Sequence, residues 1–409
     1  MKKAIIVGGS MGGLLAGNIL TREGWTVEVL ERSREGLEAR GAGIVPQRSL
    51  LAALKRAGGI VRPDIGIRIE KRVAYDRTGH AFASHRYEQF ATSWSLLYNL
   101  LRQNFPAEHF HAGANVVAVG QNPGSATVTL DNGVTFEGDL VIGADGMRSM
   151  IRGALFPKIQ PRYVGYLAWR GMLEERHAPP DFVDACFSAL NFSFPDGEEL
   201  IGYPVAGQNS NVEPGHRRFN IMWYRPISPG AELRDMFTGV DGVHHEAGIP
   251  PSLVRPELIA TMKKEAHELF PVIFANVIDR MPGMFVQAIY DLEADHMGEG
   301  RVAIIGDAAF VARPHCGAGV SKAADDAASL ADALARHDRV EDAISAFSAE
   351  RTAAGRAAVR WAARLGSYFQ MDPAGRRRGD FDPKHPPVGP DFIVKYTGIE
   401  LSEVTEDVL

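Results

Sequence analysis

The first sixty residues alternate short apolar runs with amphipathic stretches. Residues 3–7 (KAIIV) form a continuous apolar run that predicts a buried strand, residues 14–23 predict a helix, and residues 26–30 predict a second strand. Such an order is typical of a βαβ unit, in which a crossover helix joins two parallel strands. A loop at 41–47 then leads into a helix that we expect to stop at the glycine pair 58–59.

The rest of the chain divides by the same patterns. We expect strand pairs at 67–90, a helix at 92–105, a β-meander at 115–146 with a DNG turn at 131–133, a strand-rich region at 162–290 with one helix near 255–270, and a helical region at 320–369. The last forty residues are rich in turn formers, and we expect them to wrap the surface.

Composition narrows the class of protein. The chain has 409 residues, 45% of them hydrophobic and 23% charged, which is ordinary for a globular protein. A formal net charge of -6 gives no support for binding nucleic acid or an anionic membrane. The two cysteines and the absence of zinc-type Cys/His spacing favour a reducing cytoplasm and no metal. Glycines interrupt the first apolar run, and no run reaches eighteen apolar residues, so we expect neither a signal peptide nor a membrane span.

The first motif is VGGSMGGL (7–14), followed by VEVLER (27–32). It matches G-x-G-x-x-G at Gly8 and Gly13, with Ser10 in place of the middle glycine. Gly8 allows a tight turn, Gly13 allows the helix to approach the strand, and the helix start offers amides to a pyrophosphate. Glu31, at the tip of the second strand, is placed to accept hydrogen bonds from ribose hydroxyls. The motif therefore predicts an adenine dinucleotide site, the alternative being an ordinary βαβ turn.

Two later motifs also place an acidic residue after a strand. In DLVIGADGMRSMIR (139–152) the strand ends at Ala144 and Asp145 follows; alone, this segment is more typical of a hairpin-and-helix connection with an Asx turn. In GRVAIIGDAAFVARPHCGAG (300–319) Asp307 ends a strand, and the glycine loop 317–319 opens a helix near Val320. A carboxylate at the carboxyl edge of a parallel sheet can hold a sugar-like hydroxyl, and the free amides of the helix start can stabilise an anion.

In this order, the three motifs resemble those of the single-component FAD-dependent aromatic hydroxylases, along nearly the whole chain to about residue 370. Segments GYLAWRG (165–171), LIGYPVAG (200–207), ARPHCGAG (312–319) and KAADDA (322–327) are similar to those of hydroxypyridine hydroxylases within that family. The resemblance implies an α/β fold. It has a Rossmann-like FAD-binding domain like that of p-hydroxybenzoate hydroxylase, with an inserted, mostly antiparallel substrate-binding sheet.

The resemblance also implies the division of the chain and the cofactor contacts. The FAD-binding domain is expected at 1–70, 91–160 and 290–370, the substrate domain at 71–90 and 161–289, and a surface tail at 371–409. The cofactor-binding residues implied are Gly8, Ser10, Met11, Gly12, Gly13, Glu31, Arg32, Gln47, Asp145, Asp307, Pro314, Gly317, Ala318, Gly319 and Val320. Two departures from the family are Phe310, where most relatives have histidine, and the lack of an arginine at the helix start near 94, which leaves the preference between NADH and NADPH open.

The activity implied is hydroxylation of an electron-rich aromatic or hydroxypyridine-like ring, with NADH or NADPH, O2 and a flavin C4a-hydroperoxide. A base near the substrate would assist by ionising a ring hydroxyl. His315 is the first candidate, with Tyr203 also a catalytic candidate, and Trp169, Tyr203, Tyr224 and His315 are the candidate substrate contacts. Each aromatic residue is more often explained as core. Arg170 is a candidate for a substrate anion or for a structural ion pair.

Other functions keep the cofactor but change the reaction. An isoprenoid-type FAD-dependent reductase and a non-catalytic flavin redox sensor both fit the nucleotide motifs. A flavin halogenase is disfavoured because the five tryptophans stand apart and no W-x-W-x-I-P segment exists. A homodimer is expected only by analogy.

Overall fold

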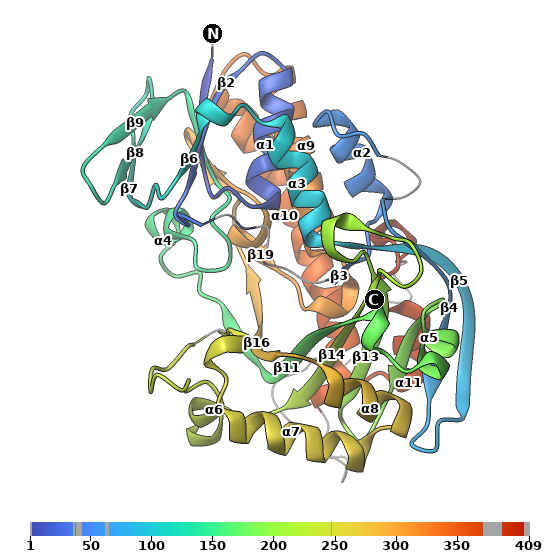
Figure 1. Cartoon of the computed structure of the whole chain (residues 1–409). Helices are drawn as coiled ribbons and strands as arrows, with labels where there is room; N and C mark the ends of the chain where they lie inside the picture. Colours follow the sequence, from blue (N-terminus) through green and yellow to red (C-terminus); the bar gives the residue numbers. More distant parts are fainter. Residues whose placement is uncertain are drawn as a thin grey trace.

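The computed structural model describes residues 2–35, 37, 43–61, 65–246, 248–370 and 387–404. Two sheets form the frame of the molecule, a parallel one near the amino terminus and a larger one at the opposite end (Figure 1). The α/β architecture expected from the sequence is confirmed.

The parallel sheet has the strand order β17-β18-β10-β1-β2-β6. Its strands are β17 (Gly298–Glu299), β18 (Val302–Ile304), β10 (Leu140–Gly143), β1 (Lys3–Val7), β2 (Thr26–Glu31) and β6 (Phe110–Ala112); only the edge strand β17 is antiparallel. Helices α1 (Met11–Arg22), α3 (Trp94–Asn104) and α9 (Gly319–Arg336) lie together beside it (Figure 1). The central strands are apolar throughout because a parallel sheet of this kind is buried on both faces.

The larger sheet has the order β15-β16-β11-β14-β13-β12-β4-β5-β3, with β19 attached to β16. Its strands are β3 (Gly43–Ile44), β4 (Ile67–Tyr75), β5 (Ala81–Ser93), β11 (Arg162–Glu174), β12 (Ala189–Ser193), β13 (Glu199–Val205), β14 (Arg218–Pro226), β15 (Gly248–Ile249), β16 (Met284–Glu293) and β19 (Phe310–Val311). All pairings are antiparallel except that of β12 with β4. Helices α7 (Pro256–Leu269) and α8 (Val272–Arg280) cover the face that carries Trp169 and Trp223 (Figure 1).

The remaining elements follow the expected pattern in part. The expected meander is formed by β7 (Val116–Gln121), β8 (Ala126–Leu130) and β9 (Thr135–Gly138), and Gly133 in the turn between β8 and β9 has a φ of 84°. Helix α2 (Arg48–Arg56) ends just before Gly58, as expected. The single helix expected in the inserted region is accompanied by α5 (Pro180–Cys186), α6 (Ala231–Met236) and α8. The predicted helical stretch at 320–369 splits into α9 and α10 (Val340–Leu365), and α4 (Met150–Leu155) follows β10. The additional helices of the inserted region are short, so they carry weak periodic signals.

The carboxyl-terminal segment is part of the core, unlike the surface tail expected from its composition. Residues 371–386 lie outside the described part of the chain, and α11 (Pro390–Tyr396) follows them. Ile393 and Val394 are fully buried against the second sheet, and Ile399 is also buried. The turn-forming residues of this segment predicted that it lies on the surface. Four of its apolar side chains are instead buried in the core, where they are removed from water.

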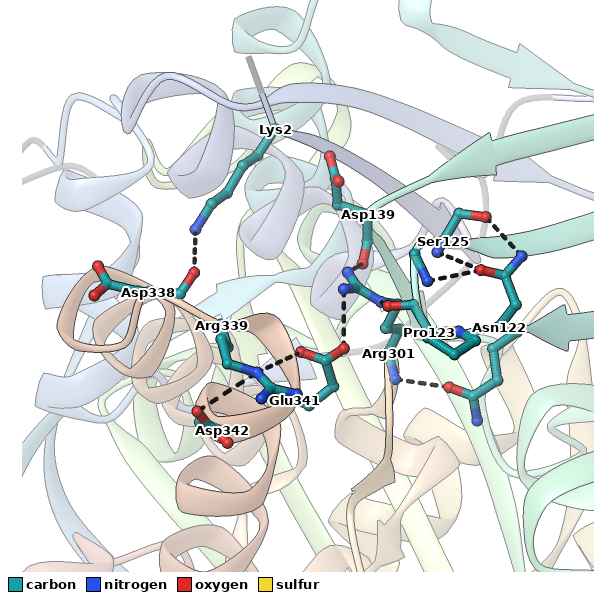
Figure 2. A network of polar contacts seen from close by, with 12 residues as sticks. Lys2, Asn122, Pro123, Ser125, Asp139, Arg301, Asp338, Arg339, Glu341 and Asp342 are labelled. Atoms are coloured by element: carbon teal, nitrogen blue, oxygen red, sulfur yellow. Dashed lines mark hydrogen bonds and ion pairs between the residues drawn. The ribbon is translucent and has the colours of Figure 1, made fainter.

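A polar network fixes the amino-terminal edge of the parallel sheet (Figure 2). Arg301 precedes β18, donates hydrogen bonds to the carbonyl oxygens of Asp139 and Pro123, and pairs with Glu341 of α10 at 2.9 Å. Asp139 in turn accepts a hydrogen bond from the backbone amide of Lys3 at 2.7 Å. These contacts tie together the starts of β1, β10 and β18. The carboxyl ends of the same strands lie at the opposite edge of the sheet, away from this network. Among the described residues, no helix is long and apolar enough to cross a membrane.

Candidate active site

Four sequence-predicted residues meet at the carboxyl edge of the parallel sheet. Gly8 follows β1, Glu31 ends β2, Asp145 follows β10 and Asp307 follows β18. The register pairs Val7 with both Leu30 and Gly143, so the strand ends are level with one another. From β18 to β2 the edge spans three strand spacings, or about 14 Å. Ligands of doubly wound sheets bind at this edge, and the span suits an extended dinucleotide.

The glycines of the first motif are required by close backbone contacts. Gly8 has a φ of 109°, and a Cβ atom on it would lie 2.3 Å from the carbonyl oxygen of Ala144. A Cβ on Gly13 would lie 1.9 Å from the carbonyl oxygen of Gly8. Ser10 caps α1 without a side-chain hydrogen bond, so its hydroxyl and the first amides of the helix can serve a phosphate. Met11 is buried in the core, and Gly12 packs near Ala323.

Glu31 and its surroundings form the first cavity, of about 260 Å³. The Glu31 carboxylate accepts hydrogen bonds from the backbone amides of Gly9 (2.8 Å) and Ser33 (2.9 Å). A carboxylate has about four acceptor positions, so acceptors remain for ribose hydroxyls. Ser10, Arg32 and Asp145 line the same cavity, as the first motif predicted for a dinucleotide.

Only one of the two carboxylate oxygens of Asp145 has hydrogen-bond donors among the described residues. Its Oδ2 accepts hydrogen bonds from the amides of Met150 (2.7 Å) and Ile151 (3.2 Å), whereas its buried Oδ1 has no partner among the described residues. Burial raises the pKa of this carboxyl above its usual value. An unpartnered buried oxygen that borders a cavity is what a ligand hydroxyl or amide would satisfy.

A second cavity, of about 310 Å³, lies where the two sheets approach each other. One side is formed by Asp307 and the loop that opens α9; the other is formed by the second sheet. The apolar and aromatic lining includes Ile44, Leu190, Ile201, Tyr203, Met222 and Ile289. Asp307 lies deep in the protein, where burial raises the pKa of its carboxyl, yet its side chain is exposed because it faces the cavity. Volume and lining match a site for a small planar ligand.

The loop before α9 has the conformation that its glycines predict. Gly317 adopts a left-handed φ of 61°, and Pro314, Gly317, Gly319 and Val320 line the cavity, while Ala318 is buried behind them. Helix α9 is 18 residues long and its amino-terminal cap makes no side-chain hydrogen bond. Its first amides are therefore available to an anionic edge of a bound group.

Gln47 has a different set of contacts from those expected. Its side-chain amide donates a hydrogen bond to the carbonyl oxygen of Ile399 at 2.9 Å, and it is buried outside both cavities. This contact holds the carboxyl-terminal segment against the loop after β3. Thr397 and Gly398 of that segment line the second cavity. The turn-rich composition around them gave no signal for this role, and the apolar run FIV (392–394) is the sequence feature consistent with packing inside.

The aromatic candidates separate by the face of the sheet they occupy. Tyr203 lines the cavity, and its hydroxyl donates a hydrogen bond to the carbonyl oxygen of Gly43 at 3.1 Å. Tyr224 is fully buried and packs on the ring of His315, with centroids 4.5 Å apart. Trp169 lies on the opposite face of β11, in the core beneath α7 and α8, so the structure does not bring it to the cavity. Successive strand residues point to opposite faces, which places Arg170 on the cavity side instead.

His315 borders the cavity but is almost entirely buried. Its Nε2 lies 2.8 Å from the hydroxyl of Tyr166, and its Nδ1 lies 3.8 Å from Oε2 of Glu199. Burial, reinforced by the positive charge of Arg313, lowers the pKa of His315 to about 3. Arg313 itself is held by Asp291 in a buried pair of 2.8 Å. His315 is therefore neutral at physiological pH and cannot hold a proton for long.

Arg170 brings a guanidinium group to the lining of the second cavity. Its Nη1 donates a hydrogen bond to Oε1 of Gln287 at 2.8 Å, and its buried Nε has no acceptor among the described residues. No carboxylate in the described part of the chain forms an ion pair with it. A partly buried arginine without a counter-charge favours an anionic ligand.

Comparisons with known proteins agree with this geometry. An FAD binding domain-like family model matches residues 163–291, and an FAD binding domain model matches residues 279–362. The chain is 29% identical to 2,6-dihydroxypyridine 3-monooxygenase of Paenarthrobacter nicotinovorans, over 93% of each chain. It is 26% identical to 3-hydroxybenzoate 6-hydroxylase of Klebsiella oxytoca, over 85% of this chain and 82% of that one.

Solved structures show the same likeness. The structure of 2,6-dihydroxypyridine-3-hydroxylase from Arthrobacter nicotinovorans superposes with a TM-score of 0.85 at 28% identity, covering 94% of this chain and 95% of that chain. Klebsiella pneumoniae HpxO, complexed with FAD and uric acid, superposes with a TM-score of 0.69 at 21% identity, covering 90% of this chain and 88% of that one, which supports the fold. The resemblance inferred from the three motifs is thereby confirmed.

Proposed function

The chain belongs to the FAD-dependent aromatic monooxygenases, and we propose that it hydroxylates a small, electron-rich heteroaromatic ring of the hydroxypyridine type, bound as an anion. The observation that carries this proposal is the second cavity, which brings an unpaired guanidinium to face the loop that opens α9. NADH or NADPH would supply the electrons and O2 the oxygen atom.

The residues at the sheet edge fit FAD. Gly8 and Gly13 let the turn and the helix start close against the carbonyl oxygens of Ala144 and Gly8, Ser10 and the start of α1 would hold the pyrophosphate, and Glu31 would hold the adenosine ribose. Asp307 would hold the ribityl chain, and the unpartnered Oδ1 of Asp145 would find a donor. When bound, the flavin supplies the chemistry of electron transfer and oxygen activation, which no side chain can provide.

The protein itself would bind and orient the reacting ring and exclude water from it. Leu190, Ile201 and Met222 of the second sheet supply apolar walls that exclude water. Tyr203 of β13 links to β3 through the carbonyl oxygen of Gly43, which holds these two strands of the cavity wall together. Arg170, oriented by Gln287, would pair with an ionised ring oxygen. Charge on that oxygen increases the electron density of the ring, which favours attack on an electrophilic oxygen atom.

A substrate screen tests the proposal. The purified protein should carry FAD, and hydroxylated pyridines should stimulate NADH or NADPH oxidation, with one labelled oxygen atom from O2 appearing in the product by mass spectrometry. Arg170→Met should weaken the binding of an ionised ligand by about 10- to 100-fold, because a charged hydrogen bond is lost, while Arg170→Lys retains part of the affinity. Arg176→Met, on an exposed arginine outside both cavities, is the matched control.

Three results would refute the proposal. A protein that reduces its ligand without O2 would be a reductase, and one that binds FAD but never shows ligand-dependent flavin reduction would be a redox sensor. Release of peroxide alone, with no oxygen in any product across the panel, would also contradict it.

A further inference from the structure

One carboxyl group beside the cavity is buried without a hydrogen-bond donor. Glu199 begins β13 and is fully buried, and neither of its carboxyl oxygens has a partner in the described part of the chain. A buried polar group without a partner destabilises a fold, and such groups in native structures usually have a functional reason. Burial raises the pKa of Glu199 to about 8. The group therefore changes charge close to neutral pH.

His315 is an ionisable neighbour of Glu199. Oε2 of Glu199 lies 3.8 Å from Nδ1 of His315, which makes no hydrogen bond within the described residues. The ring cannot turn freely, because Tyr166 contacts Nε2 at 2.8 Å and Phe369 stacks on the ring at 5.0 Å. His315 thus presents Nδ1 to Glu199 at the wall of the cavity. Catalytic hydrogen bonds are often long before the substrate binds, and they shorten in the complex.

The pKa values of the pair set the direction of proton movement. Since burial lowers the pKa of His315 to about 3 and raises that of Glu199 to about 8, a proton that reaches the imidazole passes to the carboxylate. The surrounding ionisable groups do not compete with Glu199 for this proton. Tyrosines from four elements and two arginines lie around the pair: Tyr166, Tyr203, Tyr224, Tyr368, Arg170 and Arg313. Burial raises the pKa of all four phenols, so they stay neutral, and Arg313 is already paired with Asp291.

We propose that Glu199 is the final acceptor of the proton released by a ring hydroxyl of the bound substrate, with His315 as the carrier. The O–H bond of the substrate breaks and its electron pair stays on the ring oxygen. The proton adds to the lone pair of Nδ1 of His315, because Tyr166 occupies Nε2, and then moves from the same nitrogen to Glu199, which must be in its ionised, carboxylate form to receive it. The net effect transfers one negative charge from Glu199 to the substrate, where Arg170 stabilises it, so the buried site keeps its total charge. This inference rests on the proposed function.

Proton counting on the wild-type holoprotein tests the relay directly. A hydroxylated pyridine whose ionised form has a distinct absorbance is added, in its neutral form, to oxidised FAD-loaded protein in weakly buffered solution with a pH indicator. We expect the ligand to ionise on binding near pH 8 without releasing a proton to solvent. Release of a proton for each ligand ionised would overturn the inference.

A variant pair supplies the second measurement. In Glu199→Gln the bound ligand should ionise only at higher pH, by about one pH unit or more, and the rising limb of kcat/KM against pH should move with it. Glu198→Gln is the matched control, because Glu198 is the adjacent, half-buried carboxylate but is bonded to Trp223 and Arg225. Equal shifts in both variants, or none in Glu199→Gln, would contradict the role of Glu199. If no ligand is hydroxylated at all, it is the proposed function that fails.

Discussion

Replacement of Glu199 by glutamine should stabilise the protein at alkaline pH. The substitution keeps the shape of the side chain but removes the group that ionises. Glu199 is fully buried and has no hydrogen-bond partner among the described residues, so an ionised carboxylate there is poorly solvated. The glutamine variant avoids that penalty at every pH.

The magnitude follows from the pKa of Glu199. Burial raises this pKa from 4.5 to about 8, so the folded state holds the proton more tightly than the unfolded state. The free energy of unfolding is therefore undiminished by this group below pH 4.5 and falls as the pH rises towards 8. At about 1.4 kcal/mol per pH unit, the loss amounts to about 5 kcal/mol by pH 8. His315 acts in the opposite sense as the pH falls from 6.5 to about 3, but it is present in both proteins.

Denaturant unfolding of wild type and Glu199→Gln between pH 4.5 and 9 measures this difference. The two free-energy curves should lie closest at acidic pH and separate steadily, with the variant more stable by several kcal/mol at pH 8. Glu198→Gln should show a smaller separation of the same sign, because burial also raises the pKa of Glu198 but Arg225 and Trp223 partly offset that effect. Parallel curves for wild type and Glu199→Gln would refute the reasoning, since they would mean that Glu199 is ionised at the same pH in the folded and unfolded chain.

Three further changes have expected outcomes. Asp291→Asn leaves the buried Arg313 without its counter-charge and should lower the free energy of unfolding by about 3–5 kcal/mol, measured by denaturant titration; an unchanged midpoint would contradict the burial argument. Gly13→Ala should yield protein without bound flavin, seen in its absorbance spectrum, because the new Cβ would meet the Gly8 carbonyl oxygen; normal flavin content would show that α1 can shift. Glu31→Gln should raise the Kd for FAD about 10- to 100-fold by equilibrium dialysis, and an unaltered Kd would remove Glu31 from the site.

The dinucleotide half of the candidate site could be predicted from the sequence because its geometry is local. Gly8, Gly13 and Glu31 lie within one βαβ unit, and their spacing alone fixes a turn, a helix start and a strand tip. Asp307 could be placed at the ligand edge because any residue that ends a parallel strand lies there. The family resemblance then supplied the cofactor, which the motifs alone left open.

The substrate half depended on contacts between segments far apart in the chain. Alternation along β11 shows that Trp169 and Arg170 face opposite ways, but only packing against α7 and α8 decides which face is core and which borders the cavity. Thr397 and Gly398 reach the cavity through a segment whose composition suggests the surface.

The sequence by itself determined the nucleotide-binding edge, since short-range steric and hydrogen-bonding rules specify it. The tertiary structure alone decided that Glu199 lies beside His315, 116 positions away in the chain, in a place that water does not reach. The unusual pKa values of these two side chains come from that shared burial, which no local pattern of residues encodes.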